Sequence, residues 1–126
     1  MTDSISRLYQ AAYNCRNDDP STSRTARLLR SGRSKMAKKL AEEAVEVVID
    51  AMHGDRESVV KESADLIYNL VVLWISSGIK PEDVWKEMDR RERLFGIAEK
   101  MLKPSAADKM RHRIASLDAR RLRKRG

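Results

Sequence analysis

Two acidic clusters placed symmetrically about Gly54 constrain this chain more than any other feature of its sequence. Glu46 precedes Gly54 by eight residues, and Glu62 follows it by eight. Glu43 and Asp65 are each eleven residues from the same glycine. Because an α-helix rises about 1.5 Å per residue, the two members of each pair reach equal heights in an antiparallel helical hairpin. The sequence therefore predicts that four carboxylates meet between two helices.

Hydrophobic periodicity predicts an all-α chain, and the small number of breakers, five glycines and three prolines, agrees with it. Ser34 and Asp55 are expected to cap the two long helices, and Gly78 is expected to close the second. Pro81 fits the first turn of the next helix. The predicted helices are Ser4 to Cys15, Thr25 to Leu29, Ser34 to Met52, Asp55 to Ser77, one starting at Pro81, and a last one starting near Ser105 and bearing Met110, Ile114 and Leu117.

The surroundings of the acidic clusters indicate burial and a bound cation. Glu46 is the only polar residue from Ala44 to Ile49, and Asp65 is the only charged residue from Ser63 to Ile79. Carboxylates are rarely buried unless they are paired or bind a cation, and four like charges close together repel one another. An all-oxygen ligand set without His or Cys indicates Mg²⁺ or Mn²⁺. The predicted ligands are Glu43, Glu46, Glu62 and Asp65.

An alternative is that these acids form a solvated helix face. The lysines that would pair with them are Lys35, Lys38, Lys39 and Lys61. The matched spacing about Gly54 and the apolar flanks favour the metal site. Lys39 and Asn69 are each fifteen residues from Gly54, so we expect a lysine and an amide one turn beyond the carboxylates.

The acidic pattern resembles the signature of a known family. Glu42-Glu43-x-x-Glu46, followed after fifteen residues by Glu62-x-x-Asp65, is similar to that of the all-α MazG-type nucleotide pyrophosphohydrolases. Upstream residues resemble one branch of this superfamily, the phosphoribosyl-ATP pyrophosphohydrolases of histidine biosynthesis. These residues are Ser23, Thr25, Ala26, Leu28, Leu29, Gly32, Lys35 and Lys39. The resemblance covers about residues 20–93.

The resemblance implies Mg²⁺-dependent hydrolysis between the α and β phosphates of phosphoribosyl-ATP, which gives phosphoribosyl-AMP and pyrophosphate. Glu42 and Glu46 are then the candidate catalytic residues, one of them as general base. The candidate substrate-binding residues are Lys35, Lys39, Arg33 and Asn69. Arg27, Arg30 and Arg33 either bind phosphate or are solvated charges. Ser23 and Thr25 either contact phosphate or cap a turn.

The sequence departs from the branch at three positions. Arg24, Ala41 and Asn69 stand where Tyr, Gly and His are usual. An alternative function is therefore a MazG-type house-cleaning enzyme that removes a different nucleoside triphosphate. A further alternative, from another class, is a non-enzymatic helical protein that binds nucleic acid through its basic end.

The charge of the chain is concentrated at one end. The net charge is +7, and residues 100–126 contain ten Lys or Arg and two Asp. We therefore predict an all-α pyrophosphohydrolase domain over residues 1–99 and a basic C-terminal helical extension over residues 100–126. The extension can hold phosphate backbones non-specifically, but it has no interleaved aromatic residues for stacking on bases. Nucleic acid is not the expected partner.

The two long helices carry more apolar faces than one hairpin can bury. We expect an obligate homodimer in which two hairpins form a four-helix core. The residues to be covered are Val45, Val48, Ile49, Leu66, Ile67, Leu70, Val71 and Trp74. One cysteine, Cys15, excludes an internal disulfide framework and agrees with a cytoplasmic location. The run from Leu66 to Ile75 is too short for a membrane span, and the N-terminal residues lack a signal-peptide pattern.

Overall fold

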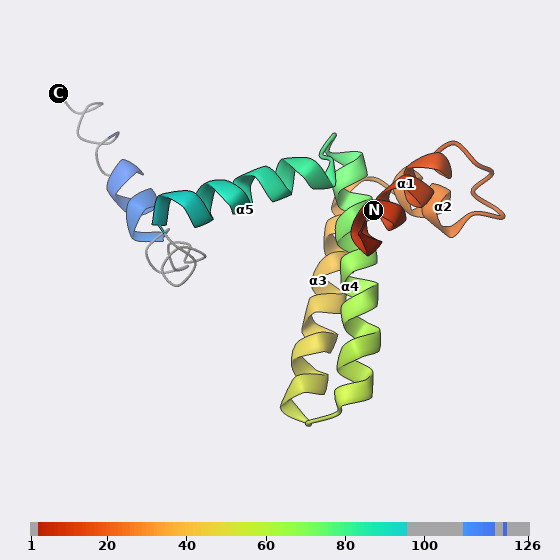
Figure 1. Ribbon diagram of the computed structural model, residues 1–126, viewed down its shortest axis with the longest axis horizontal. Coiled ribbons are helices and arrows are strands. Elements are labelled where there is room, and N and C mark those ends of the chain that lie inside the picture. The colour runs from red at the N-terminus through yellow and green to blue at the C-terminus, as the bar shows by residue number, and fades with distance from the viewer. Residues whose placement is uncertain (1–2, 96–109, 118–119, 121–126) are drawn as a thin grey trace. The chain divides into compact units, whose positions relative to one another are not determined.

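The computed structural model describes residues 3–95, 110–117 and 120, and no strand occurs among them. The fold class is all-α, as predicted. The labelled helices are α1 (Ser4–Asn14), α2 (Arg24–Arg30), α3 (Arg33–Met52), α4 (Arg56–Ser76) and α5 (Pro81–Phe95), and residues 110–117 are helical as well (Figure 1). The predicted start of the last helix near Ser105 lies outside the described residues. No helix of the described part combines the length and apolarity that a bilayer crossing requires.

Helices α3 and α4 form the antiparallel hairpin that the acidic spacing predicts (Figure 1). Gly54 has a φ of 69°, a left-handed conformation that glycine adopts without a steric penalty, and its N–H donates to the Ala51 carbonyl. Asp55 caps α4, since its side chain accepts the Ser58 N–H at 3.2 Å and the Ser58 hydroxyl at 2.8 Å. The predicted turn and cap are confirmed, and they fix the register of the two helices.

The start of α3 differs from the prediction. Ser34 was expected to be the N-cap, but helical geometry begins at Arg33, and Gly32 is the capping residue without a side-chain hydrogen bond. The φ of Gly32 is 97°, so this glycine lets the backbone turn directly from α2 into α3. Ser23 does cap α2, because its hydroxyl accepts the Ala26 N–H at 3.1 Å. The cap, one of the two readings of Ser23, is therefore present.

The buried core lies where α1 and α2 meet the hairpin. Figure 1 shows these two short helices beside the end of the hairpin that is remote from Gly54. Each of the first four helices contributes buried side chains, which are Ala12, Ala26, Met36, Val71, Val72 and Trp74. The small alanines let the short helices approach closely, and burial of the larger side chains supplies the hydrophobic stabilisation. The core therefore anchors the far end of the hairpin, and the Gly54 end extends beyond it.

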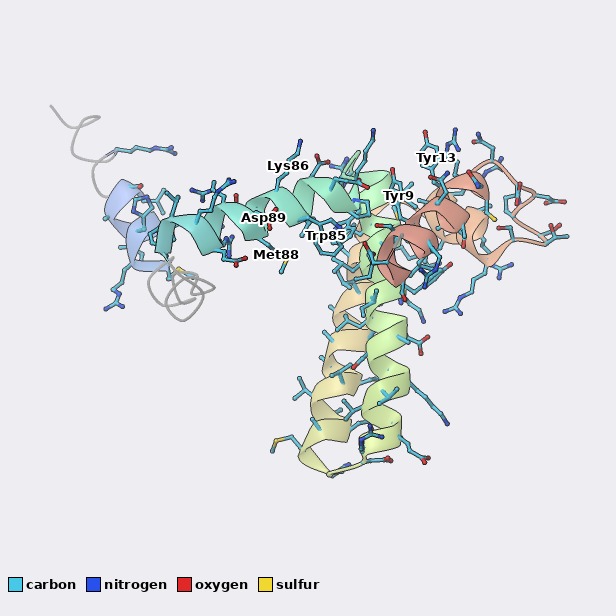
Figure 2. The ribbon with its side chains drawn as sticks, viewed as in Figure 1. Tyr9, Tyr13, Trp85, Lys86, Met88 and Asp89 are labelled. Carbon is cyan, nitrogen blue, oxygen red and sulfur yellow. The ribbon has the colours of Figure 1, made fainter. Side chains whose placement is uncertain are left out.

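The chain leaves α4 through a glycine turn, as predicted. Gly78 has a φ of 71°, and the Ile79 N–H donates to the Trp74 carbonyl at 2.8 Å. Pro81 is the buried first residue of α5. Trp85, labelled in Figure 2, meets Trp74 edge to face, with ring centroids 6.4 Å apart.

By compactness the chain divides into two units, Met1–Trp85 and Lys86–Gly126. The predicted domains, residues 1–99 and 100–126, were drawn instead from charge and family resemblance. They stay a prediction.

Candidate functional site

Three of the four predicted metal ligands come together between α3 and α4. Side-chain oxygens of Glu43, Glu62 and Asp65 all lie within 4.8 Å of one another. Glu43 is only 7% exposed. One oxygen of Glu43 and one of Glu62 are buried without a hydrogen-bond partner. Because buried polar atoms are nearly always satisfied, these two oxygens are suited to a bound cation as their partner.

The fourth predicted ligand, Glu46, lies beside this trio and interacts with it. Hydrogen bonding to Glu46, then hydrogen bonding to Glu43 and burial, raise the pKa of Glu62 from 4.5 to about 7. The physical cause is that several carboxylates share one small volume, so one of them retains a proton. A divalent cation would relieve the same crowding, and an all-carboxylate donor set fits Mg²⁺ or Mn²⁺. The residues present therefore fit such an ion.

A single lysine faces the cluster in the described part of the chain. Lys39 Nζ lies 3.6 Å from Glu43 Oε1, one helical turn away on α3. This is the only ion pair there between the acids of the cluster and the four lysines that the solvated-face alternative invokes. One partly exposed lysine does not neutralise a cluster of this size, so the alternative explains only part of the arrangement.

The remaining predicted site residues lie around the cluster in different settings. Glu42 and Glu46 are exposed on α3, and Arg33 is the exposed first residue of that helix. Asn69 is buried on α4, one turn beyond Asp65, and its Nδ2 donates to the Asp65 carbonyl at 2.8 Å. The Asn69 Oδ1 atom is buried without a hydrogen-bond partner.

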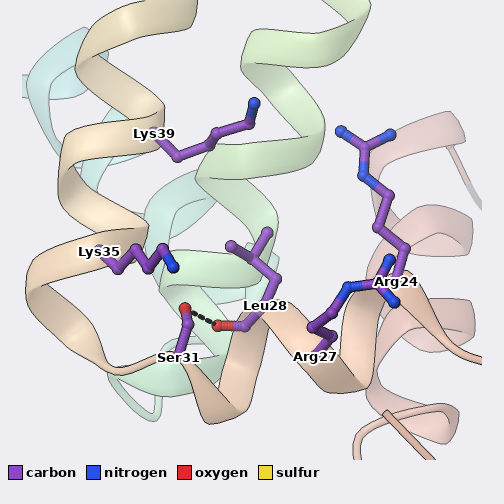
Figure 3. A pocket seen from close by; sticks show the side chains of 6 residues that line it. All are labelled: Arg24, Arg27, Leu28, Ser31, Lys35 and Lys39. Atoms are coloured by element: carbon purple, nitrogen blue, oxygen red, sulfur yellow. Dashed lines mark hydrogen bonds between the residues drawn. The ribbon is translucent and has the colours of Figure 1, made fainter. Parts of the chain in front are cut away.

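A cationic pocket of about 240 Å³ lies between α2 and α3. Figure 3 shows two arginines from α2 and two lysines from α3, with Leu28 between the two pairs. The lining residues are Arg24, Arg27, Leu28, Ser31, Lys35 and Lys39. None of them is acidic. Because Lys39 lines the pocket and also pairs with Glu43, the pocket adjoins the carboxylate cluster.

Sequence reasoning found part of this pocket. Lys35 and Lys39 were predicted to bind substrate, and both line it. Arg33 and Asn69 are not among its lining residues. Arg24 and Ser31 were missed, although the three-residue spacing of Arg24 and Arg27 already places both arginines on one side of α2.

A contact between α2 and α4 holds the pocket wall in place. The Thr25 and Tyr68 hydroxyls are 2.7 Å apart, and the Arg24 guanidinium lies over the Tyr68 ring, 5.3 Å from its centroid. This second contact is within cation–π range. Thr25 therefore makes a contact between helices.

An acidic cluster that fits a divalent cation, next to a pocket lined by cations, defines an all-α enzyme that acts on phosphate compounds. The chain belongs to the phosphoribosyl-ATP pyrophosphohydrolase family, whose family model matches residues 5–92. The family and the enzyme class predicted from the sequence are confirmed.

Individual relatives agree with this assignment. The chain is 59% identical to "Phosphoribosyl-ATP pyrophosphatase 2" of Rhodopseudomonas palustris, over 98% of both chains. It is 57% identical to the protein of the same name from Bradyrhizobium diazoefficiens, over 99% of both chains. It is 49% identical to "Phosphoribosyl-ATP pyrophosphatase" of Gluconobacter oxydans, over 79% of this chain and 75% of the relative. The first two matches extend beyond residue 92, where the family model ends.

Proposed function

We propose that this chain hydrolyses phosphoribosyl-ATP between its α and β phosphates and releases phosphoribosyl-AMP and pyrophosphate. Family membership supports the substrate. The observation that carries the proposal is the carboxylate trio Glu43, Glu62 and Asp65, with unpartnered buried oxygens, directly beside a cationic pocket. The carboxylate trio can bind a cation, and the adjoining cationic pocket can bind phosphate groups.

The proposed ligands of Mg²⁺, or of Mn²⁺ in its place, are Glu43, Glu46, Glu62 and Asp65. Glu46 joins the trio through its interaction with Glu62. A bound divalent ion neutralises phosphate charge and lowers the pKa of the attacking water.

The chain's own side chains supply the remaining functions. Glu46 or its neighbour Glu42, both exposed on α3, accepts the proton of the attacking water as general base. Lys35 and Lys39 contact phosphate oxygens as point charges, and Arg33 adds a further cation at the start of the same helix. Asn69 positions the turn of α4 that bears Asp65, because its amide donates to the Asp65 carbonyl.

A different nucleoside triphosphate is the second candidate substrate. No residue that lines the cationic pocket is aromatic, and its cations can bind the phosphates of any nucleotide. Asn69 also differs from the histidine usual in the branch.

Pyrophosphate release from phosphoribosyl-ATP and from a panel of nucleoside triphosphates, with and without Mg²⁺, tests both candidates. Preferred turnover of phosphoribosyl-ATP supports the first. Preferred turnover of another triphosphate replaces it with the second. Release that does not depend on a divalent ion contradicts the metal site.

An obligate homodimer is the proposed assembly, and the cytoplasm is the proposed compartment. The Gly54 half of the hairpin exposes large apolar side chains, although Val71 and Trp74 are already buried within the chain. The exposed ones are Val45, Val48, Ile49, Met52, Val60 and Ile67. A second hairpin packed on this face would complete a four-helix core. Ile49 lies three residues after Glu46, so the same contact would border the carboxylate cluster.

A further inference from the structure

We propose that the cationic pocket between α2 and α3 binds the β and γ phosphates of the nucleotide, the part that leaves as pyrophosphate. The proposal rests on the proposed function, because it assigns a place to one product of that hydrolysis. It adds Arg24 and Arg27 to the residues that bind substrate.

The charges that line the pocket indicate an anionic ligand. Four of its six lining residues are cations, and none is an acid. Within the described part of the chain, no carboxylate lies within 4.0 Å of the charged groups of Arg24, Arg27 or Lys35. Like charges placed around one small volume repel one another, and a multiply charged anion reverses the sign of that interaction. Phosphate oxygens also accept charge-assisted hydrogen bonds from both arginine and lysine.

The size of the pocket favours a small anion over a whole nucleotide. Its volume is about 240 Å³. Pockets that enclose a drug-sized ligand usually measure about 300–1,000 Å³. The base and the sugars therefore lie outside it.

The position of the pocket indicates which phosphates it takes. Lys39 lines the pocket, and its Nζ is 3.6 Å from Glu43 Oε1 in the carboxylate cluster. If the α–β bond is broken at that cluster, the pocket beside Lys39 holds a phosphate next to that bond, either the α phosphate or the β phosphate with the γ phosphate attached. The β and γ phosphates carry the highest charge density of the substrate, and their oxygens match four cations better than a single phosphate does.

Two contacts fix the arginines of the pocket. Arg27 Nη1 donates to the Pro20 carbonyl at 3.1 Å, which leaves its other donors for a ligand. Arg24 lies over the ring of Tyr68, three residues after Asp65 on α4. Tyr68 is therefore a positioning residue that ties the pocket wall to the helix that carries the acids.

Binding of inorganic pyrophosphate to the full chain, measured by calorimetry in EDTA, tests the proposal without metal or turnover. Arg24→Gln and Lys35→Gln should each weaken binding by about tenfold or more, because each removes a charge-assisted hydrogen bond. Arg30→Gln and Lys38→Gln are the matched controls. They remove the same charges from the same helices but do not line the pocket, and they should change binding little. Circular dichroism verifies that each variant is folded. If one of the two pocket variants does not fold, the other still tests the proposal.

Two results would overturn the proposal. Equal weakening by the pocket and control variants would mean that the helices attract the anion only through their general charge. Tighter binding of ribose 5-phosphate than of pyrophosphate, with the same sensitivity to Arg24→Gln, would assign the pocket to the ribosyl phosphate instead. The proposed function fails separately, through absence of phosphoribosyl-ATP hydrolysis with Mg²⁺, whatever the result of the pyrophosphate titration.

Discussion

The Tyr68 hydroxyl lies 2.7 Å from the Thr25 hydroxyl, a part-buried hydrogen bond between residues 43 positions apart in the chain. It joins the first turn of α2 to the middle of α4. The Arg24 guanidinium also lies over the Tyr68 ring. One tyrosine thus links the helix that carries two of the clustered acids to the helix that supplies half of the pocket's cations.

Tyr68→Phe should destabilise the protein by about 1 kcal/mol, the net value of a typical hydrogen bond, while it keeps the ring under Arg24. It should also raise KM more than it lowers kcat, because α2 contributes to substrate binding rather than to the bond that breaks. Chemical denaturation and steady-state kinetics measure the two effects. Thr25→Val should behave in the same way. Fully additive effects of the two substitutions would mean that the hydroxyls do not act together.

Glu46→Gln should abolish Mg²⁺-dependent hydrolysis and leave the protein folded, since it removes a proposed ligand from a site with excess negative charge. Without metal the variant should be at least as stable as the wild type, because a repulsion within the cluster is relieved. Pyrophosphate release at saturating Mg²⁺ is the measurement. Asp50→Asn, one turn further along α3, is the matched control and should keep most activity. Unchanged turnover of Glu46→Gln would refute the site assignment.

The raised pKa of Glu62 predicts how the stability of the metal-free protein depends on pH. Its pKa is about 7 in the folded chain against an ordinary 4.5, so the folded state holds more protons than the unfolded state between these values. Stability should therefore fall as pH rises from about 4.5 to about 7. Thermal denaturation in EDTA measures this slope. Glu62→Gln should flatten it, and a slope that is the same in the variant would place its origin elsewhere.

The carboxylate cluster could be predicted from sequence because helical geometry is local. Once Gly54 turns the chain and Asp55 caps α4, counting residues places Glu43 level with Asp65, and Glu62 lies one turn from Asp65 on α4. The all-α class followed from the same periodicity. The substrate was predicted from the family resemblance, because the spacing of residues says nothing about which nucleotide binds.

The pocket could be predicted only in part, because it depends on how α2 is rotated against the hairpin. That rotation is set by contacts such as Thr25 with Tyr68, between residues far apart in the chain. The spacing of Arg24 and Arg27 shows that they share a helix face, but not what that face meets. The expected Ser34 cap was wrong for a local reason: the positive φ of Gly32 makes this glycine the cap, two residues before Ser34.

Deletion of residues 105–126 should lower activity only modestly. The family model ends at residue 92, and every member of the carboxylate cluster and of the cationic pocket precedes that point. The measurement is pyrophosphate release by the truncated chain, with its oligomeric state checked by sedimentation. Complete loss of activity with folding and assembly retained would assign the basic segment to the substrate site.

The exposed apolar face of the hairpin predicts that the chain is a homodimer at micromolar concentration, with no stable folded monomer. Val48 is 60% exposed and Met52 is 82% exposed. A contiguous apolar face is costly in water, and a second hairpin can cover it. Val48→Asp should therefore dissociate or unfold the protein, because a charge would be buried in the new core. Leu94→Asp, at an equally exposed apolar residue of α5, is the control and should leave the assembly unchanged. Sedimentation velocity distinguishes the states, and a fully active, folded 14.4 kDa monomer of the unmodified chain would refute the four-helix core.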